Sequence, residues 1–283
     1  MKLSCSTRCI PDYSFDLALK AIAGAGFRYL ETSTYETGSA LEPTIVHTVG
    51  IKETFARHRL SLSSLNLTPI EKGVGSPLCE APAGPTGKGL PTPFSDLGLR
   101  REVVMARELW LDVINVSAGR ADEAPRDAVL ASLRQLADYC AGLGISLALA
   151  NSPGSHVATA NDIERALAEI DRPNVGVLLD LVRLHLAGED VPAAVDRLAS
   201  RTLVVRTGDV AGGRGVALGT GEIDNARLLG RLAEAGYVGF VVLELAITAR
   251  GEVEPLMAQA RERLDPLVAE PPLAPVIRPR AGG

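Results

Sequence analysis

The chain has 283 residues, 46% of them hydrophobic and 22% charged, with four cysteines and a formal net charge of −5 at pH 7. These values are typical of a globular protein, and they exclude a disulfide scaffold and the strongly basic surface of a nucleic-acid-binding protein. No apolar run approaches the ~18 residues of a membrane span and the N-terminus lacks the apolar core of a secretory signal, so we expect a soluble, cytoplasmic protein with no membrane or nucleic-acid partner.

A unit of helix, glycine, short apolar strand and polar turn recurs along the chain. It is clearest in "AIAGAGFRYLETS" (21–33), "YCAGLGISLALANS" (139–152) and "LAEAGYVGFVVLEL" (232–245). Glycine suits the left-handed C-terminal cap of a helix, and nearly all-apolar strands are typical of a covered parallel sheet. The pattern predicts eight strands: Leu3–Ser6, Tyr29–Thr32, Ser61–Leu67, Val113–Ser117, Ser146–Ala150, Gly176–Asp180, Thr202–Arg206 and Gly239–Glu244.

Helical periodicity fills most of the intervals between these strands. The predicted helices are Phe15–Ala25, Thr44–Arg59, Leu97–Leu109, Asp127–Leu143, Ala160–Ile170, Val191–Ser200, Asn225–Ala235 and Glu252–Leu264. Eight alternating β and α units at this length predict an α/β protein, a (β/α)8 TIM barrel in a single domain. A doubly wound open sheet is the alternative, but it normally carries a glycine-rich phosphate turn after the first strand, and "SCSTRCIP" is not one.

Two segments interrupt the pattern. Residues 68–95 form a long loop rich in glycine and proline, which would lie over the top of the barrel as a lid, a binding loop or a disordered segment. We expect the barrel to span residues 1–264 and residues 265–283 to form a proline-rich tail. The tail is either a disordered end or a segment that packs over a neighbouring subunit of a homo-oligomer. The excess of arginine over lysine is typical of a bacterial genome rich in G and C.

The C-terminal ends of the strands form the active-site face of a TIM barrel. Three acids, Glu31, Asp180 and Glu244, and one arginine, Arg206, are predicted to reach this face. A cation at the end of a buried strand needs a partner, because desolvating it alone costs several kcal/mol. The strands on either side of Arg206 carry Asp180 and Glu244, so we predict that Arg206 pairs with both.

Several segments of the second half resemble a known family. They are "LRQLADYCAGLGISLALANSPG" (133–154), "VGVLLDLVRLHLAGED" (175–190), "VVRTGDV" (204–210), "LGTGEID" (218–224) and "VVLEL" (241–245). Together they resemble the xylose-isomerase-like TIM barrels, the sugar phosphate isomerase and epimerase group. The resemblance covers roughly residues 100–250 and implies an isomerase, an epimerase or a dehydratase-type lyase.

The resemblance also implies a divalent metal held by Glu, Asp, His and Glu on strands five to eight. The matching positions here are Ala150, Asp180, Arg206 and Glu244, and a family histidine that tends to bind substrate is Arg183. Arginine stays protonated and cannot ligate a metal, and catalytic metal sites normally keep about three protein ligands. We therefore predict no metal and no other cofactor, with Arg206 in place of the ion. The alternative is a weak ion held by the three carboxylates.

The loss of an acid at Ala150 argues against epimerisation by two opposed bases. Glu244 remains as a general acid or base, with Asp180 as a second candidate. Arg206 and Arg183 could stabilise an enolate or hold a substrate carboxylate, and His156, in the loop after the fifth strand, is the remaining catalytic candidate.

Candidate substrate-binding residues share a place at a strand end or in the loop or helix that follows it. They are Arg183, Glu31, Asn66, Asn151, Arg214 and His185. Three of them have structural alternatives: His185 could pack or face solvent, Arg214 could brace its loop, and Glu31 could anchor Arg8.

Three functions are consistent with these residues. The first is a metal-independent isomerase, epimerase or lyase that transfers a proton on a small polar or anionic carbonyl or hydroxy compound, such as a sugar, a keto acid or a biosynthetic intermediate. The second is a barrel that has lost its chemistry and serves as a binding subunit. The third is a conventional metal-dependent sugar isomerase or epimerase with metal ligands that the sequence does not reveal.

Overall fold

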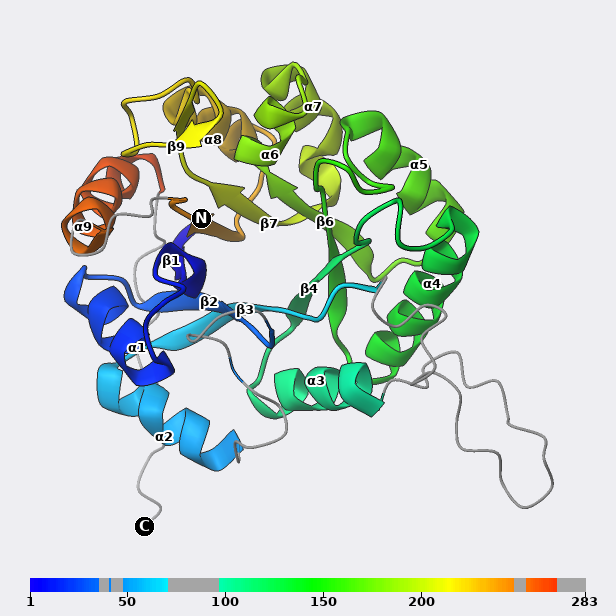
Figure 1. Cartoon of the computed structure of the whole chain (residues 1–283), viewed down its shortest axis with the longest axis horizontal. Coiled ribbons are helices and arrows are strands. Elements are labelled where there is room, and N and C mark those ends of the chain that lie inside the picture. The colour runs from blue at the N-terminus through cyan, green and yellow to red at the C-terminus, as the bar shows by residue number, and fades with distance from the viewer. Residues whose placement is uncertain (36–40, 42–47, 71–96, 247–252, 269–283) are drawn as a thin grey trace, which may run out of the picture.

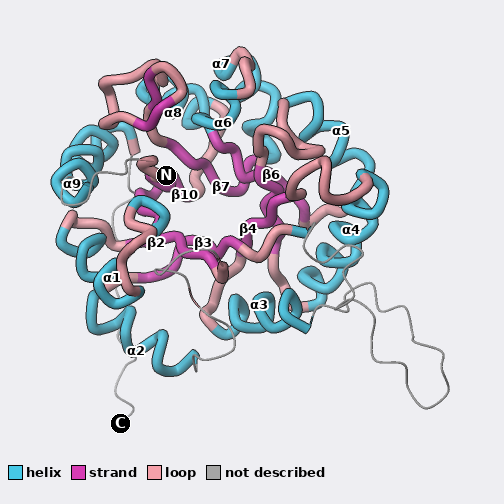
Figure 2. Tube along the Cα trace, in the orientation of Figure 1, coloured by secondary structure: helices cyan, strands magenta, loops and turns pink. Residues whose placement is uncertain are grey.

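Eight parallel strands close into a barrel in the computed structural model, and helices surround it (Figures 1 and 2). The structure describes residues 1–35, 41, 48–70, 97–246 and 253–268. The order around the ring is β1-β10-β7-β6-β5-β4-β3-β2. The strands are β1 (Lys2–Ser6), β2 (Tyr29–Ser33), β3 (Ser61–Asn66), β4 (Val113–Ser117), β5 (Ser146–Ala150), β6 (Val175–Asp180), β7 (Thr202–Thr207) and β10 (Phe240–Leu243). The predicted TIM barrel is confirmed.

The helices that cover the barrel match the sequence periodicity closely. They are α1 (Phe15–Gly24), α2 (Thr48–His58), α3 (Leu97–Glu108), α4 (Arg126–Gly142), α5 (Ala160–Ile170), α7 (Val191–Leu198), α8 (Asn225–Glu234) and α9 (Val253–Leu264). None of the helices in the described part of the chain is long and apolar enough to cross a membrane. The predicted loop at 68–95 and tail at 265–283 lie outside the described residues, apart from 68–70 and 265–268.

Two elements at the C-terminal face have no counterpart in the sequence prediction. A short helix, α6 (Leu181–Leu186), begins directly after β6, and strands β8 (Val210–Ala211) and β9 (Arg214–Gly215) form a hairpin after β7. Asp180 caps α6, because its carboxylate accepts a hydrogen bond from the backbone N–H of Arg183 at 3.0 Å. Both elements therefore lie where the barrel carries its candidate site.

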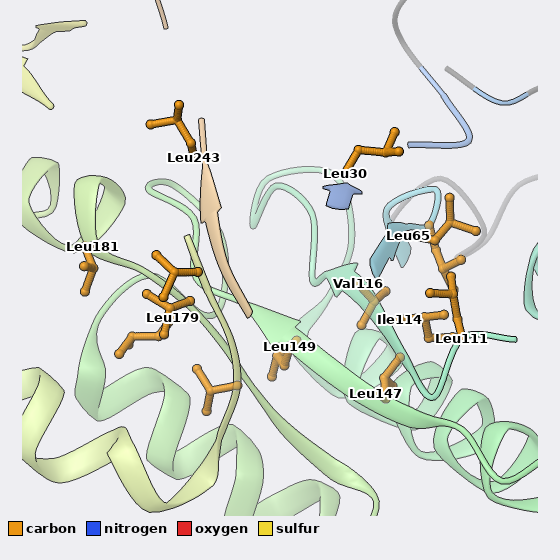
Figure 3. Packing of buried hydrophobic residues seen from close by; sticks show 14 of the residues in the cluster. Leu30, Leu65, Leu111, Ile114, Val116, Leu147, Leu149, Leu179, Leu181 and Leu243 are labelled. Atoms are coloured by element: carbon orange, nitrogen blue, oxygen red, sulfur yellow. The ribbon is translucent and has the colours of Figure 1, made fainter. Parts of the chain in front are cut away.

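Apolar side chains on the outward faces of the strands pack against the helices and make the main core. Figure 3 shows several of them, including Leu30, Leu149 and Leu243. A smaller apolar group fills the barrel interior and consists of Ala148, Ala150, Leu178, Val204 and Val242. Outward and inward side chains alternate because a strand has a two-residue period. The next inward positions, at the C-terminal ends of the strands, carry polar residues.

The end of β7 lies against the end of β10 with no room for a side chain between them. The backbone N–H of Glu244 donates to the carbonyl of Thr207 at 2.8 Å. A Cβ atom on Gly208, the next residue, would overlap the carbonyl oxygen of Glu244. The glycine in "RTGDV" therefore permits the close approach that places Glu244 beside β7.

A buried aspartate folds the loop that follows Gly208. The carboxylate of Asp209 accepts four backbone hydrogen bonds of 2.8–3.1 Å. Their donors are Val210, Gly219, Gly221 and Ile223. Satisfying this many amides stabilises a loop that has little regular structure.

Gly208→Ala should destabilise the protein by about 1–3 kcal/mol, because the added methyl group forces β7 and β10 apart. Gly230→Ala is the matched control, since Gly230 lies in α8 with open space around its Cβ position. In a helix this exchange is neutral or stabilising by up to about 1 kcal/mol. Urea denaturation measures both values, and equal stability of the two variants would contradict the close packing of Gly208.

Candidate active site

Arg206 is the centre of the candidate site, and only 3% of its side chain is exposed. Its Nη2 donates hydrogen bonds to Glu31 Oε1 at 2.7 Å and to Asn66 Oδ1 at 2.9 Å, and its Nη1 lies 3.5 Å from Asp180 Oδ2. Its Nε lies 3.1 Å from Glu244 Oε2, an ion pair without the geometry of a hydrogen bond. One guanidinium thus contacts three carboxylates, two from the strands β2 and β6 and one from the residue that follows β10. The predicted pairing with Asp180 and Glu244 is present.

Glu31 is fully buried and faces Arg206 across the barrel interior. Its other oxygen, Oε2, accepts hydrogen bonds from Ser64 Oγ at 3.0 Å and from Asn115 Nδ2 at 2.8 Å. The same amide nitrogen of Asn115 lies 3.1 Å from Asn66 Oδ1. These contacts join β2, β3 and β4 to β7. Glu31 therefore anchors Arg206 here rather than Arg8.

Asp180 links Arg206 to Arg183. Its Oδ2 lies 3.2 Å from Arg183 Nε. Asn151 fixes the aspartate backbone, accepting from the N–H of Asp180 at 2.9 Å and donating to its carbonyl at 3.2 Å. Burial raises the pKa of Asp180 above its ordinary value, although the charges of Arg183 and Arg206 oppose the shift.

Glu244 is the most exposed of the three carboxylates, with 20% of its side chain accessible. Burial alone would raise its pKa, but the charges of Arg206, Arg8 and Arg183 more than offset this effect and lower it. The pKa of Arg206 is raised by its carboxylates despite its burial. At neutral pH the site therefore holds a permanent guanidinium beside an ionised, partly accessible carboxylate.

Cys9 fixes the backbone on both sides of Glu244. Its Sγ accepts a hydrogen bond from the N–H of Leu245 at 3.1 Å and lies 3.6 Å from the carbonyl oxygen of Leu243. Cys9 is itself buried, with its sulfur 3.9 Å from that of Cys5. The thiol therefore helps to hold Glu244 at the barrel mouth.

Two of the three remaining sequence candidates form their polar contacts away from this cluster. His156 Nε2 is 2.8 Å from the carbonyl oxygen of Ala124, and His185 Nε2 is 2.8 Å from Glu222 Oε2. Arg214 is exposed on β9. Within the described ranges none of these three makes a hydrogen bond or ion pair with Arg206 or its carboxylates.

Four residues of the cluster were given no catalytic or substrate-binding role from the sequence, although three of them were expected at the strand ends and only Ser64 was not. They are Arg8, Cys9, Ser64 and Asn115. Asn115 and Ser64 point inward from β4 and β3, and a strict two-residue alternation would have added Ser64 to the residues expected at the strand ends. Arg8 lies two residues after the end of β1, at the active-site face of the barrel.

The donor set does not fit a divalent metal. Ala150 supplies no ligand atom, and the guanidinium of Arg206 occupies the space between the three carboxylates. A second cation placed there would meet the charge of Arg206 directly. In the part of the chain that the structure describes, no group of three or more His, Cys, Asp and Glu side chains is arranged to hold a metal.

Arg206→Met should destabilise the protein by about 3–5 kcal/mol at pH 8, because it leaves buried carboxylates without their cation. Without that cation the effect of burial dominates, and the folded-state pKa values of Asp180 and Glu244 rise above their unfolded values. Their contribution to stability is then present at low pH and is lost as the pH rises. The decrease in the free energy of unfolding caused by Arg206→Met should therefore be smaller at pH 5 than at pH 8.

Thermal or urea unfolding at the two pH values measures this difference. Arg197→Met is the control, since Arg197 pairs with Glu164 at the surface and should contribute little. A pH-independent loss in Arg206→Met would show that the carboxylates do not depend on the guanidinium.

Comparison with known proteins agrees with this fold. A "Putative hydroxypyruvate isomerase" of Streptomyces coelicolor is 43% identical over 86 residues, 28% of this chain and 30% of that protein. Fructoselysine 3-epimerase of Escherichia coli O157:H7 is 26% identical over 144 residues, 49% of this chain and 52% of that protein. The chain thus spans about half or less of the length of these curated relatives.

A solved structure, the D-allulose 3-epimerase from a Methylomonas species, superposes with a TM-score of 0.72 at 20% identity. The match covers 95% of this chain and 98% of that one, and it shows a shared fold. Residues 19–267 match the family described as "Xylose isomerase-like TIM barrel". The chain therefore belongs to the xylose isomerase-like TIM barrel family.

Proposed function

We propose that the protein is an isomerase-type enzyme that moves a proton on a small polar or anionic carbonyl or hydroxy compound without a divalent metal. The observation that carries this proposal is Glu244, an ionised carboxylate at the accessible edge of a buried cluster. A general base must be charged and reachable, and Glu244 is both. The names of the relatives, which are isomerases and epimerases, support the reaction class.

The residues around Glu244 divide into positioning and contacting groups. Arg206 and Asp180 are buried, so their role is to hold Glu244 and Arg183 in place. Arg183, with 24% of its side chain exposed, can reach a substrate oxygen. Glu244 would remove a proton from a carbon next to a carbonyl, and Arg183 would stabilise the negative oxygen of the enolate.

Two products can follow from this enolate. Return of the proton to the neighbouring carbon or to the opposite face gives an isomer or epimer. Departure of a hydroxyl group from the next carbon, with uptake of a proton, gives a dehydrated product and water. Both outcomes begin with removal of the same carbon-bound hydrogen by Glu244. Loss of that hydrogen in D2O, with deuterium entering when a proton is returned to carbon, therefore detects either.

A non-catalytic binding subunit is the second candidate function. The near-complete burial of Arg206, with every guanidinium nitrogen facing an acceptor, favours it. Such a protein would bind a ligand at the barrel mouth but would exchange none of its hydrogens. The same measurement therefore separates the two functions.

Sugars, hydroxy acids and oxo acids should be incubated with the protein in D2O with EDTA present, and their spectra followed by NMR. Deuterium should enter at least one compound, and Glu244→Gln should reduce its rate by a factor of about 100 or more, the typical contribution of a general base. Glu234→Gln, on the exposed face of α8, should match the wild type. Exchange that requires added metal, or that survives Glu244→Gln, would overturn the proposal.

The dependence of the exchange rate on pH should follow the ionisation of Glu244. Its pKa is lowered, so the base stays ionised until the pH falls below the ordinary glutamate value of about 4.3. The exchange rate should therefore fall only below that pH, provided that the protein remains folded. An acid limb above pH 5 would mean that another group acts as the base.

A further inference from the structure

Two partly exposed arginines lie on either side of Glu244 at the barrel mouth. Arg8 is in the short turn Thr7–Cys9 that follows β1, and Arg183 is in the first turn of α6 after β6. The strand order β1-β10-β7-β6 places the end of β10, and thus Glu244, between them. Both charges act on the carboxyl group of Glu244.

These two arginines differ from Arg206 in having unused donors. Arg183 places Nε against Asp180 and Nη1 at 3.5 Å from the carbonyl of Asn151, and its Nη2 has no hydrogen-bond partner among the described residues. Arg8 donates through Nη2 to the hydroxyl of Tyr35 at 2.8 Å. Its remaining nitrogens have no acceptor in the described part of the chain.

Arg8 is half-buried, and among the described residues no carboxylate lies close enough to form an ion pair with it. Its guanidinium carbon lies 5.4 Å from the ring centroid of Tyr35. A partly desolvated guanidinium normally faces an acid, because its lost hydration must be replaced. The tyrosine fixes the orientation of Arg8 but supplies no negative charge.

We propose that Arg8 and Arg183 bind a carboxylate of the substrate, which makes small 2-oxo or 2-hydroxy acids the substrate class rather than neutral sugars. Arginine is suited to this role because its planar donors match the two oxygens of a carboxylate. A carboxylate held there places the adjacent carbons at Glu244, and the same cations offset the charge of an enolate. The inference rests on the proposed function only in assigning Glu244 as the base.

Calorimetric titration tests the proposal with matched ligands that differ only at one carbon. Hydroxypyruvate carries a carboxylate where dihydroxyacetone has a hydroxymethyl group, and 2-keto-D-gluconate differs from D-fructose in the same way. The acid of at least one pair should bind about tenfold or more tightly than its neutral partner, because hydrogen bonds to a charged group are the stronger kind. This comparison uses the wild-type protein alone.

Arg8→Gln and Arg183→Gln should each remove most of the preference for the acid. Arg120→Gln, on an exposed arginine that pairs with Asp122, should leave it unchanged. Equal affinity within both pairs, no binding of either acid at millimolar concentration, or equal effects of all three variants would overturn the proposal.

Glu244→Gln separates this inference from the proposed function. It removes a negative charge beside the bound anion, so the acid should bind as tightly as in the wild type or more tightly. Acid binding with no hydrogen exchange in any variant would leave the anion site standing and refute the catalytic role of Glu244. Hydrogen exchange on a neutral sugar, with no binding of either acid, would support the catalytic role of Glu244 and refute the anion site.

Discussion

The contact of one buried guanidinium with three carboxylates is the interaction on which the C-terminal end of this barrel depends. Arg206 meets Glu31, Asp180 and Glu244, which come from three other parts of the chain. Each of these acids would be costly to bury alone, and together they would repel one another. The cation makes their proximity stable, and through them it fixes the start of α6 and the end of β10.

A site built around this arginine contacts a substrate differently from a site built around a metal ion. A divalent metal can bind substrate oxygens through open positions, whereas a buried arginine with its nitrogens engaged cannot. In the proposed function, substrate contact passes to the groups at the rim, which are Glu244, Arg183 and Arg8. The buried arginine would then act as a scaffold, and the partly exposed arginines would supply the charge that faces the ligand.

Much of the fold follows from local sequence patterns, because each βα unit repeats a helix, a glycine and an apolar strand. The pairing of Arg206 with Asp180 and Glu244 was also predictable, since adjacent strands carry these residues. The contact with Glu31 was not, because 175 positions separate the two residues and they meet across the barrel. Helix α6 escaped prediction because one aspartate cap, rather than a long periodic stretch, starts it.

We infer that Arg206 occupies the position that a divalent metal ion would take among these carboxylates and that it excludes one. The most direct measurement is the metal content of the protein purified without chelators, incubated with Mn²⁺ and desalted, with mass spectrometry to count ions per chain. We predict far less than one ion per chain, because the carboxylates already share a permanent cation. One tightly retained ion per folded chain would contradict this assignment of Arg206.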